Sequence, residues 1–305
     1  MKKFNLGKSD LIVPAVAVGC MRIWNMSDKD LAEHLDYCIT QGLNFFDHAD
    51  IYGKGRSEER FCEVFAQLPY KREDIILQSK CGIRPNMYDF SKEHILASVD
   101  GSLKRLGTDY LDVLLLHRPD ALCEPEEVAE AFDILKSSGK VRYFGVSNHR
   151  PLQIELLKQY VNQELLVNQL QFGPAHSTMI TSGIEANMVT DGAVDRDGGV
   201  LDYSRLNKMT IQAWSPFIFG YPKEIFVGNE RMSRLNAALE EMAQELNTTP
   251  MAITTAWILR HPANIQMLAG TTKTDRMAQI LNGIDIKLTR EQWYKIYTSA
   301  GHLLP

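Results

Sequence analysis

The chain has 305 residues, of which 45% are hydrophobic and 23% are charged, so it can bury a large core as one α/β barrel or as two smaller domains. Its net charge of -5 at pH 7 gives no general attraction to phosphate backbones, and the sequence has no local basic face, which argues against nucleic-acid binding. No apolar run approaches the roughly 18 residues that cross a membrane, so no membrane partner is expected.

The predicted elements begin with a β-hairpin over Lys3–Val13, which turns at Gly7-Lys8-Ser9. After it, apolar and β-favouring runs bounded by turn residues recur along the chain. The runs are Ala15–Val18, Leu43–Phe46, Ile75–Gln78, Leu111–Leu116, Val141–Val146, Leu165–Leu170, Thr210–Trp214 and Ile265–Ala269. Helical periodicity lies between them, for instance over Asp28–Gln41, Arg56–Leu68, Ser91–Leu106, Glu126–Ser138, Pro151–Tyr160 and Arg231–Leu246. Apolar strands that alternate with helices predict a parallel sheet buried on both faces.

Eight strand runs in one chain of this length favour a closed (β/α)8 TIM barrel of class α/β, preceded by the β-hairpin. An open doubly wound sheet is disfavoured because the first strand-to-helix turn lacks a G-x-G-x-x-G cradle for a dinucleotide. One stretch of 30 residues, Gln171–Val200, is rich in Gly, Thr, Asp and Asn, and so long a connection is usually functional or mobile. Since no linker divides the chain, residues 1–305 are expected to form a single domain.

The cysteines give no sign of a disulfide framework or a zinc site, because they are odd in number and never spaced C-x-x-C. They are Cys20, Cys38, Cys62, Cys81 and Cys123. The basic start Met1-Lys2-Lys3 resembles the beginning of a signal peptide, but Lys8-Ser9-Asp10 interrupts it. We therefore expect a cytoplasmic protein without a metal, either a monomer or a weak homo-oligomer.

Four polar residues follow successive apolar runs. Asp47 comes after the second run, with Tyr52 five residues later, Lys80 after the third and His117 after the fourth. Taken singly, such residues are often helix caps, surface charges or satisfied polar groups. In a barrel of this kind, however, the active site is built at the carboxyl ends of the strands, so the four should converge.

Their chemistry suits the reduction of a carbonyl group. The alkoxide that forms must be protonated, and the neutral phenol of Tyr52 can supply the proton. A free tyrosine has a pKa of about 10, and the ammonium of Lys80 should lower that pKa by stabilising the phenolate. Asp47 would pair with Lys80 and aim it, while His117 can hydrogen-bond the substrate oxygen.

Longer motifs surround these residues. They are Asn44–Gly53 (NFFDHADIYG), Ser79–Gly82 (SKCG), Leu114–Asp120 (LLLHRPD) and Gly139–Asn148 (GKVRYFGVSN). Their order resembles the successive signatures of the aldo-keto reductase family, in particular of bacterial oxidoreductases with the motif Asp-His-Ala-Asp-Ile-Tyr-Gly. The resemblance implies a barrel, the roles argued above for Asp47, Tyr52, Lys80 and His117, and NADPH-dependent reduction of an aldehyde or ketone. His117 stands where double-bond-reducing relatives carry Glu, which favours a carbonyl substrate.

The same resemblance implies the cofactor site. Ser147, Asn148 and Gln169 would bond the nicotinamide carboxamide, and Trp214 would stack on the ring where many members of the family have Tyr. The remaining expected cofactor contacts are Met21, Asp47, Ser215, Pro216, Phe217, Gly270, Thr272, Lys273, Arg276 and Gln279. Ser215-Pro216-Phe217 would hold the pyrophosphate, and Gly270–Arg276 would hold the adenosine end at a helix start.

The choice of NADPH over NADH depends on Lys273 and Arg276, which can bind a 2′-phosphate as a charge-assisted pair. Two basic residues in a first helical turn oppose the helix dipole, which favours an anionic ligand over a purely solvated face. Gln279 and Ile280 depart from the family's usual Glu and Asn at the adenine end.

Substrate contacts are expected from Trp24 and His117, in loops around the mouth of the barrel. Met21, Met87, Tyr88 and Phe219 can add apolar surface, and Arg22, Arg84 and Arg118 can attract an acidic substrate.

Two other functions are open. One is an NADPH-binding regulatory or redox-sensing protein that resembles potassium-channel β subunits. The other is a metal-dependent hydrolase built on Asp47-His48-Ala49-Asp50, for which the sequence offers no further ligand cluster.

Overall fold

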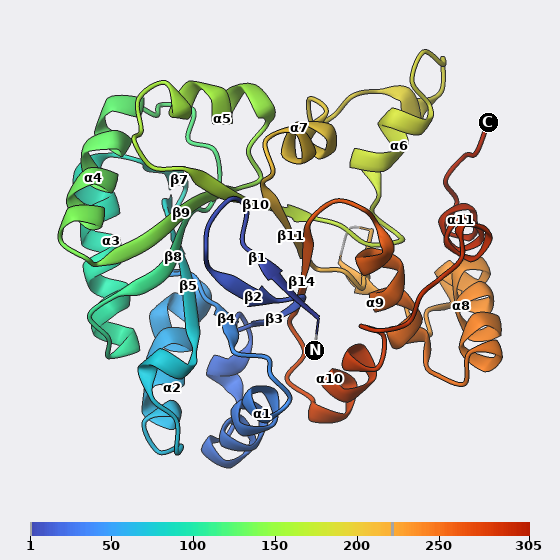
Figure 1. Cartoon of the computed structure of the whole chain (residues 1–305), viewed down its shortest axis with the longest axis horizontal. Coiled ribbons are helices and arrows are strands. Elements are labelled where there is room, and N and C mark those ends of the chain that lie inside the picture. The colour runs from blue at the N-terminus through green and yellow to red at the C-terminus, as the bar shows by residue number, and fades with distance from the viewer. Residues whose placement is uncertain (1, 221–222) are drawn as a thin grey trace.

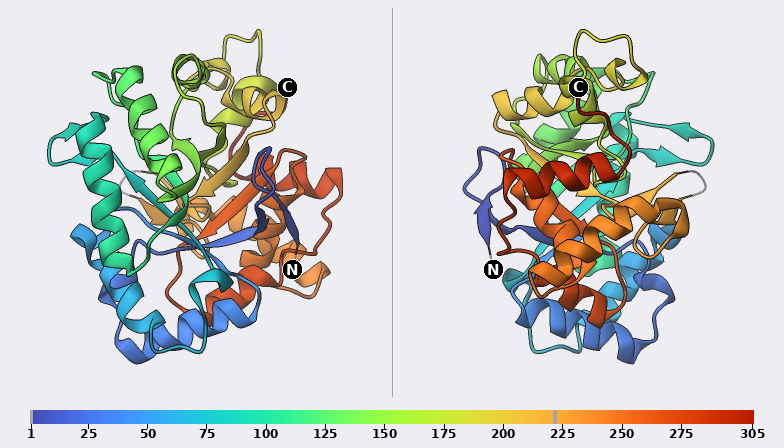
Figure 2. Two further views of the ribbon diagram at one scale, coloured as in Figure 1. Left: turned by 60° about the vertical axis from the view of Figure 1, so that its left-hand side comes forward. Right: turned by 90° about the vertical axis from the view of Figure 1, so that its right-hand side faces the viewer.

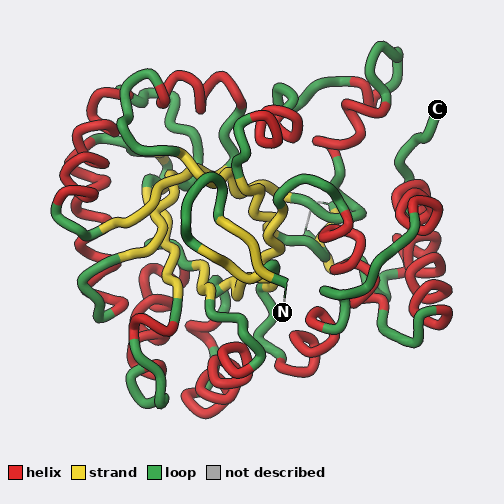
Figure 3. Tube along the Cα trace, in the orientation of Figure 1, coloured by secondary structure: helices red, strands yellow, loops and turns green. Residues whose placement is uncertain are grey.

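The computed structural model describes residues 2–220 and 223–305. Its centre is a closed barrel of eight parallel strands, ringed by helices (Figures 1 and 3). In barrel order the strands are β3 (Val16–Gly19), β4 (Phe45–Asp47), β5 (Ile76–Cys81), β8 (Leu111–Leu116), β9 (Val141–Ser147), β10 (Leu165–Gln171), β11 (Thr210–Trp214) and β14 (Ile265–Ala269). Pairing of Met267 on β14 with Val16 on β3 closes the ring. The predicted TIM barrel is confirmed.

The helices agree with the predicted segments to within a few residues where a segment is amphipathic. Those that match are α1 (Asp28–Thr40), α2 (Arg56–Phe65), α3 (Lys92–Leu106), α4 (Pro125–Ser137), α5 (Pro151–Lys158) and α8 (Ser233–Glu245). Outside the predicted segments lie α6 (Thr178–Ile184), α7 (Val200–Leu206), α9 (Pro250–Arg260) and α11 (Arg290–Ser299), and α10 (Thr274–Leu281) follows the expected helix start. In the described residues, no helix has both the length and the apolar character needed to span a bilayer.

The N-terminal hairpin closes the bottom of the barrel. Strands β1 (Lys3–Asn5) and β2 (Ile12–Pro14) pair antiparallel, which confirms the predicted hairpin. Leu6 at its turn is fully buried, and a Cβ at Gly7 would lie 2.7 Å from the carbonyl oxygen of Leu166. The turn therefore packs directly on the amino ends of the strands, and the floor is apolar.

Two short hairpins lie beyond the predicted elements. β6 (Ile83–Arg84) pairs with β7 (Met87–Tyr88) just past β5, and β12 (Ile218–Phe219) pairs with β13 (Glu224–Ile225) past β11. In the right-hand view of Figure 2 the blue N-terminal hairpin and the cyan β6–β7 hairpin lie on opposite sides of the molecule. The carboxyl ends of the strands thus form the open mouth, and the long stretch after β10 contains helix α6.

Candidate active site

Four of the predicted site residues meet at the mouth. Lys80 is the centre, because its Nζ donates to Asp47 Oδ2 at 2.8 Å, to Tyr52 Oη at 3.1 Å and to the backbone oxygen of His48 at 2.8 Å. The ring of His117 lies 6.0 Å from that of Tyr52, centroid to centroid. The strand boundaries differ slightly from the prediction, since Asp47 ends β4 and Lys80 lies inside β5 rather than beyond it.

The backbone around Tyr52 fixes its position. Tyr52 opens a short 3-10 turn in which Gly53 and Lys54 both have left-handed backbones, with φ of 58° and 59°. A Cβ at Gly53 would lie 2.7 Å from the Trp24 ring, so this close approach requires glycine. Trp24 thus packs behind the turn that carries Tyr52.

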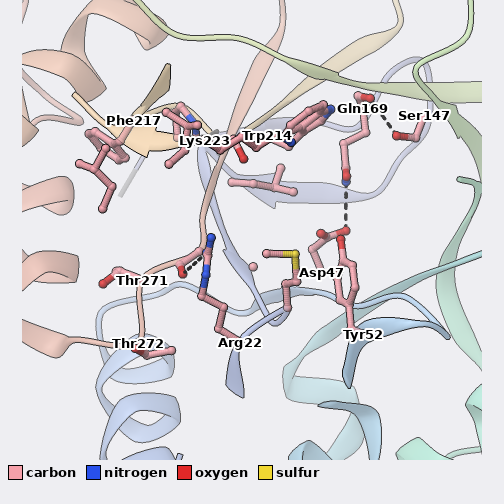
Figure 4. Close-up of a pocket in the computed structure, with 18 of the residues that line it drawn as sticks. Arg22, Asp47, Tyr52, Ser147, Gln169, Trp214, Phe217, Lys223, Thr271 and Thr272 are labelled. Atoms are coloured by element: carbon pink, nitrogen blue, oxygen red, sulfur yellow. Dashed lines mark hydrogen bonds between the residues drawn. The ribbon is translucent and has the colours of Figure 1, made fainter. Parts of the chain in front are cut away.

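Beneath these four residues, which we call the tetrad, lies a layer of buried glutamines. Gln78 Nε2 donates to Asp47 Oδ1 at 2.6 Å, and Gln169 Nε2 donates to the same oxygen at 3.0 Å. Both also bond Gln212, which donates in turn to Gln266 at 2.8 Å. Figure 4 shows the bond between Gln169 and Asp47. The carboxylate of Asp47 is therefore held on one oxygen by amides and on the other by Lys80.

The charges of this group follow from its burial. Burial lowers the pKa of Lys80, but Asp47 and Tyr52 more than offset that effect, and the net pKa lies above its ordinary value. Lys80 is a charged ammonium at neutral pH. Its side chain and that of Asp47 are 0% and 2% exposed, so the two form a buried ion pair.

The pKa of Tyr52 departs from expectation. Burial raises it, and Lys80 lowers it only in part, so the net pKa lies above the ordinary value for tyrosine. The predicted lowering of the Tyr52 pKa is wrong, because the prediction included the Lys80 ammonium but not the desolvation of the phenol. Tyr52 is a neutral phenol near pH 7, the form that donates a proton.

His117 is a neutral imidazole. Burial lowers its pKa to about 2, helped by the positive charges of Lys80 and Arg118. Its Nδ1 is buried and has no hydrogen-bond partner among the described residues. A neutral imidazole carries one N–H, so His117 can donate one hydrogen bond to an oxygen in the pocket.

A cavity of about 680 Å³, which we call the main pocket, runs from the tetrad to the start of α10. Nearly all predicted cofactor residues line it, namely Met21, Asp47, Ser147, Asn148, Gln169, Trp214, Ser215, Pro216, Phe217, Gly270, Thr272, Lys273 and Arg276. Figure 4 labels Asp47, Ser147, Gln169, Trp214, Phe217 and Thr272 among them. Tyr52 and His117 line it too, while Lys80 lies beneath the surface. A single cavity thus extends from Tyr52 and His117 to the basic residues Lys273 and Arg276.

The family is settled by comparison with known proteins. The family model described as Aldo/keto reductase family matches residues 15–299. The chain belongs to this family. It is 38% identical over 320 residues to the uncharacterized oxidoreductase YcsN of Bacillus subtilis (strain 168), with 100% of both chains covered. It is 32% identical to 6-dehydroglucose reductase of Agrobacterium fabrum, with 93% of each chain covered.

A solved structure gives the same result for the fold. The crystal structure of the thermostable aldo-keto reductase Tm1743, in complex with the inhibitor epalrestat, has a TM-score of 0.79 at 25% identity and covers 98% of this chain and 100% of that chain. The sequence resemblance to aldo-keto reductases is therefore confirmed, and the chain is an oxidoreductase of this family.

Several expected contacts of this aldo-keto reductase do not line the main pocket. Trp24, Gln279, Arg84, Met87 and Tyr88 lie outside it. Trp24 packs on Gly53, and Arg84 pairs with Asp89 at 2.6 Å in the β6–β7 hairpin. Where Gln279 was expected, its neighbour Ile280 faces the cavity instead.

Other residues line the pocket without having been predicted as cofactor contacts. Arg22, in the loop after β3, donates to the backbone oxygen of Gly270, just past the neighbouring strand β14, at 3.2 Å. Lys223 lies with its Nζ 4.6 Å from the centre of the Trp214 ring. Lys223 has no sequence signal, because only the β12–β13 hairpin returns it to the mouth.

The end of the pocket near Tyr52 has polar groups that suit an amide ligand. Asn148 and Ser215 have left-handed backbones, with φ of 60° and 49°. Trp214 Nε1 donates to Asn148 Oδ1 at 3.2 Å, which fixes the indole plane. Both N–H bonds of the Gln169 amide are used toward Asp47 and Gln212, so its Oε1 is left to accept from a carboxamide.

The far end fits an anion. Lys273 precedes helix α10 and Arg276 lies in its first turn, and both face the pocket. Neither takes part in any ion pair within residues 2–220 and 223–305. Two uncompensated cations at a helix start attract a phosphate group.

Proposed function

We propose that this protein reduces an aldehyde or ketone to an alcohol with NADPH, and that Tyr52 is the general acid. The observation that carries the proposal is the 3.1 Å contact of the Lys80 ammonium with the Tyr52 hydroxyl, inside a pocket that His117 also lines. A protonated phenol held against a buried cation is suited to give up its proton as negative charge forms beside it.

The pocket supports NADPH as the cofactor. Reduced nicotinamide, when bound, supplies the hydride that adds to the carbonyl carbon. Ser147, Asn148 and Gln169 would hold its carboxamide, and Trp214 would lie against the ring. At the other end, Lys273 and Arg276 would bind the 2′-phosphate, which NADH lacks.

The protein's own part is a proton transfer to the carbonyl oxygen. Tyr52 Oη donates its proton to that oxygen as the carbon is reduced, and His117 donates a hydrogen bond to the same oxygen. The phenolate left on Tyr52 is stabilised by Lys80, which Asp47 keeps in place. Solvent then restores the proton to Tyr52, and the cycle is complete once the alcohol and the oxidised cofactor have left.

Steady-state oxidation of NADPH across a panel of aldehydes and ketones tests the proposal. We expect Tyr52→Phe to lower kcat by roughly 10²–10⁴-fold, the usual contribution of a general acid, while NADPH binding measured by fluorescence stays intact. Tyr70→Phe makes the same chemical change outside the pocket, where Tyr70 bonds Asp36 at 2.6 Å, and should leave turnover unchanged.

The regulatory or sensing function is the alternative result of this experiment. Tight NADPH binding with no turnover of any carbonyl, in the parent protein as in Tyr52→Phe, would overturn the proposed reduction. NADH in place of NADPH should raise the KM for the cofactor, and equal KM values would remove the role given to Lys273 and Arg276.

A further inference from the structure

A second cavity opens beside the main pocket, and we call it the side pocket. Its volume is about 370 Å³, and it shares Arg118, Asn148, Trp214 and Lys223 with the main pocket. The rest of its wall includes the loop after β9 and the stretch that follows β10, with Arg150, His176, Arg196 and Asp197 among its polar residues. The side pocket therefore borders the main pocket, which Tyr52 and His117 line, and Arg118 lines both.

The wall of the side pocket is strongly positive. It has four cations, Arg118, Arg150, Arg196 and Lys223, against one acid, Asp197. Arg196 is neutralised by Asp191 at 2.8 Å. In the described part of the chain, the other three cations take part in no ion pair, although Arg150 lies near enough to Asp195 and Asp197 for its charge to act on both carboxyls.

Two histidines on this wall add no charge. Burial lowers the pKa of His149 to about 4 and also lowers that of His176. Both are neutral at pH 7, so the excess charge comes from arginine and lysine alone. Guanidinium groups present a planar fork of donors that matches carboxylate and phosphate oxygens, and the match is specific as well as strong.

Arg118 is the positive residue of the side pocket that lies beside the proposed active site. It directly follows His117, whose imidazole faces the reacting oxygen in the proposed function, and its Cζ lies 5.8 Å from the centre of the Trp214 ring. A ligand group bound at Arg118 therefore shares the main pocket with the Tyr52 hydroxyl, because both residues line it. Arg150 lines only the side pocket.

Building on the proposed function, we propose that the carbonyl substrate is an anion, with a carboxylate or phosphate group that Arg118 and Arg150 bind while the carbonyl faces Tyr52. Lys223 is not used to test this proposal, because it borders both pockets and can equally reach a cofactor phosphate. The anionic group does not react, so its binding acts mainly on KM for the carbonyl compound.

The experiment compares matched pairs of charged and neutral substrates. Para-carboxybenzaldehyde is set against its methyl ester, and glyceraldehyde 3-phosphate against glyceraldehyde, so that the two arms separate carboxylate from phosphate. We expect kcat/KM to favour the charged member of at least one pair by about tenfold or more, as a charge-assisted hydrogen bond implies. Arg118→Gln and Arg150→Gln should each lower that preference, mainly through KM.

Arg84→Gln is the matched control. It removes the same charge near the mouth, but Arg84 pairs with Asp89 and lines neither pocket, so the preference should persist. If Arg84→Gln lowers the preference as much as Arg118→Gln does, the effect is general attraction and the proposed site is wrong. If the parent prefers neither charged substrate, or if Arg118→Gln changes only the KM for NADPH, the proposal is also overturned.

A binding measurement separates this inference from the proposed function. Calorimetry with para-hydroxymethylbenzoate and its methyl ester reports anion recognition without turnover, and the acid should bind about tenfold more tightly. Tighter binding of the acid with no reduction of any carbonyl would refute the proposed function but leave an anion site. Reduction of carbonyls with equal binding of acid and ester would refute the anion site alone.

Discussion

Asp47→Asn should destabilise the protein far more than an ordinary substitution does. Lys80 Nζ and Asp47 Oδ2 are 2.8 Å apart and almost completely buried. At an effective dielectric constant of about 20, the attraction at this distance is roughly 6 kcal/mol. Desolvation of the two charges offsets much of it, and breaking one side of a buried pair typically costs about 3–5 kcal/mol. We expect a loss in the free energy of unfolding within that range.

The hydrogen bonds around Asp47 add to the loss. Its Oδ1 accepts from Gln78 and Gln169, and its Oδ2 accepts from Lys80. An asparagine has one oxygen and one NH₂ group, so in either orientation a donor faces another donor. The misfit leaves at least one buried polar group unsatisfied, at a cost of about 1–3 kcal/mol that overlaps with the loss of charge.

Urea unfolding of three variants tests this reasoning. Asp47→Asn with Lys80→Met removes both charges and should recover part of the stability lost in Asp47→Asn alone. Asp112→Asn breaks a comparable buried carboxylate, paired with Arg72 at 2.7 Å, and should reduce stability without reducing turnover. The reasoning is refuted if Asp47→Asn costs less than about 1 kcal/mol, or if the double variant is no more stable than the single one.

Three further outcomes are expected. Lys273→Ala and Arg276→Ala should each raise the KM for NADPH by about tenfold or more and leave that for NADH nearly unchanged; equal effects on both cofactors in steady-state assays would contradict the 2′-phosphate contact. Burial lowers the pKa of His48 to about 3, so the folded state keeps it neutral. The stability that the neutral His48 contributes is complete above the unfolded pKa of about 6.5 and is lost as pH falls toward 3, by up to ~1.4 kcal/mol per pH unit. In urea unfolding between pH 7 and 4, His48→Leu should therefore lose less free energy of unfolding than the parent protein does. The same pH dependence in both proteins would be inconsistent with a neutral His48. In Gly173→Ala the new Cβ would lie 2.2 Å from the carbonyl oxygen of Pro216, so the loop at Ser215–Phe217 must shift, and weaker NADPH binding by fluorescence titration is expected.

The barrel could be predicted because its strands carry their own signal. Leu111–Leu116 and Thr210–Trp214 were found at their observed bounds, since each is an apolar run between turn residues. The amphipathic helices were found for the same reason. Helix α9 was missed because residues 252–259 are all buried, so it has no polar face and no helical alternation to detect.

The site was predictable only where it depends on strand ends. Asp47 and Lys80 lie on two neighbouring strands and His117 directly follows a third, and parallel register brings neighbouring strand ends together. The glutamine layer had no such signal, because Gln78 and Gln212 are 134 positions apart and meet only across the closed barrel. The position of Trp24 had no such signal either, since only the fold shows that it packs on Gly53 and does not line the main pocket.

The pKa of Tyr52 shows what a list of neighbours leaves out. Lys80 is the neighbour that the sequence predicts, and its charge alone would lower the pKa of Tyr52. Burial has the opposite sign and is the larger effect. A raised pKa agrees better with the proposed chemistry, because the acid must hold its proton until negative charge appears on the carbonyl oxygen. Lys80 then acts on the phenolate that forms, in the transition state rather than in the resting enzyme, which is where an interaction accelerates a reaction.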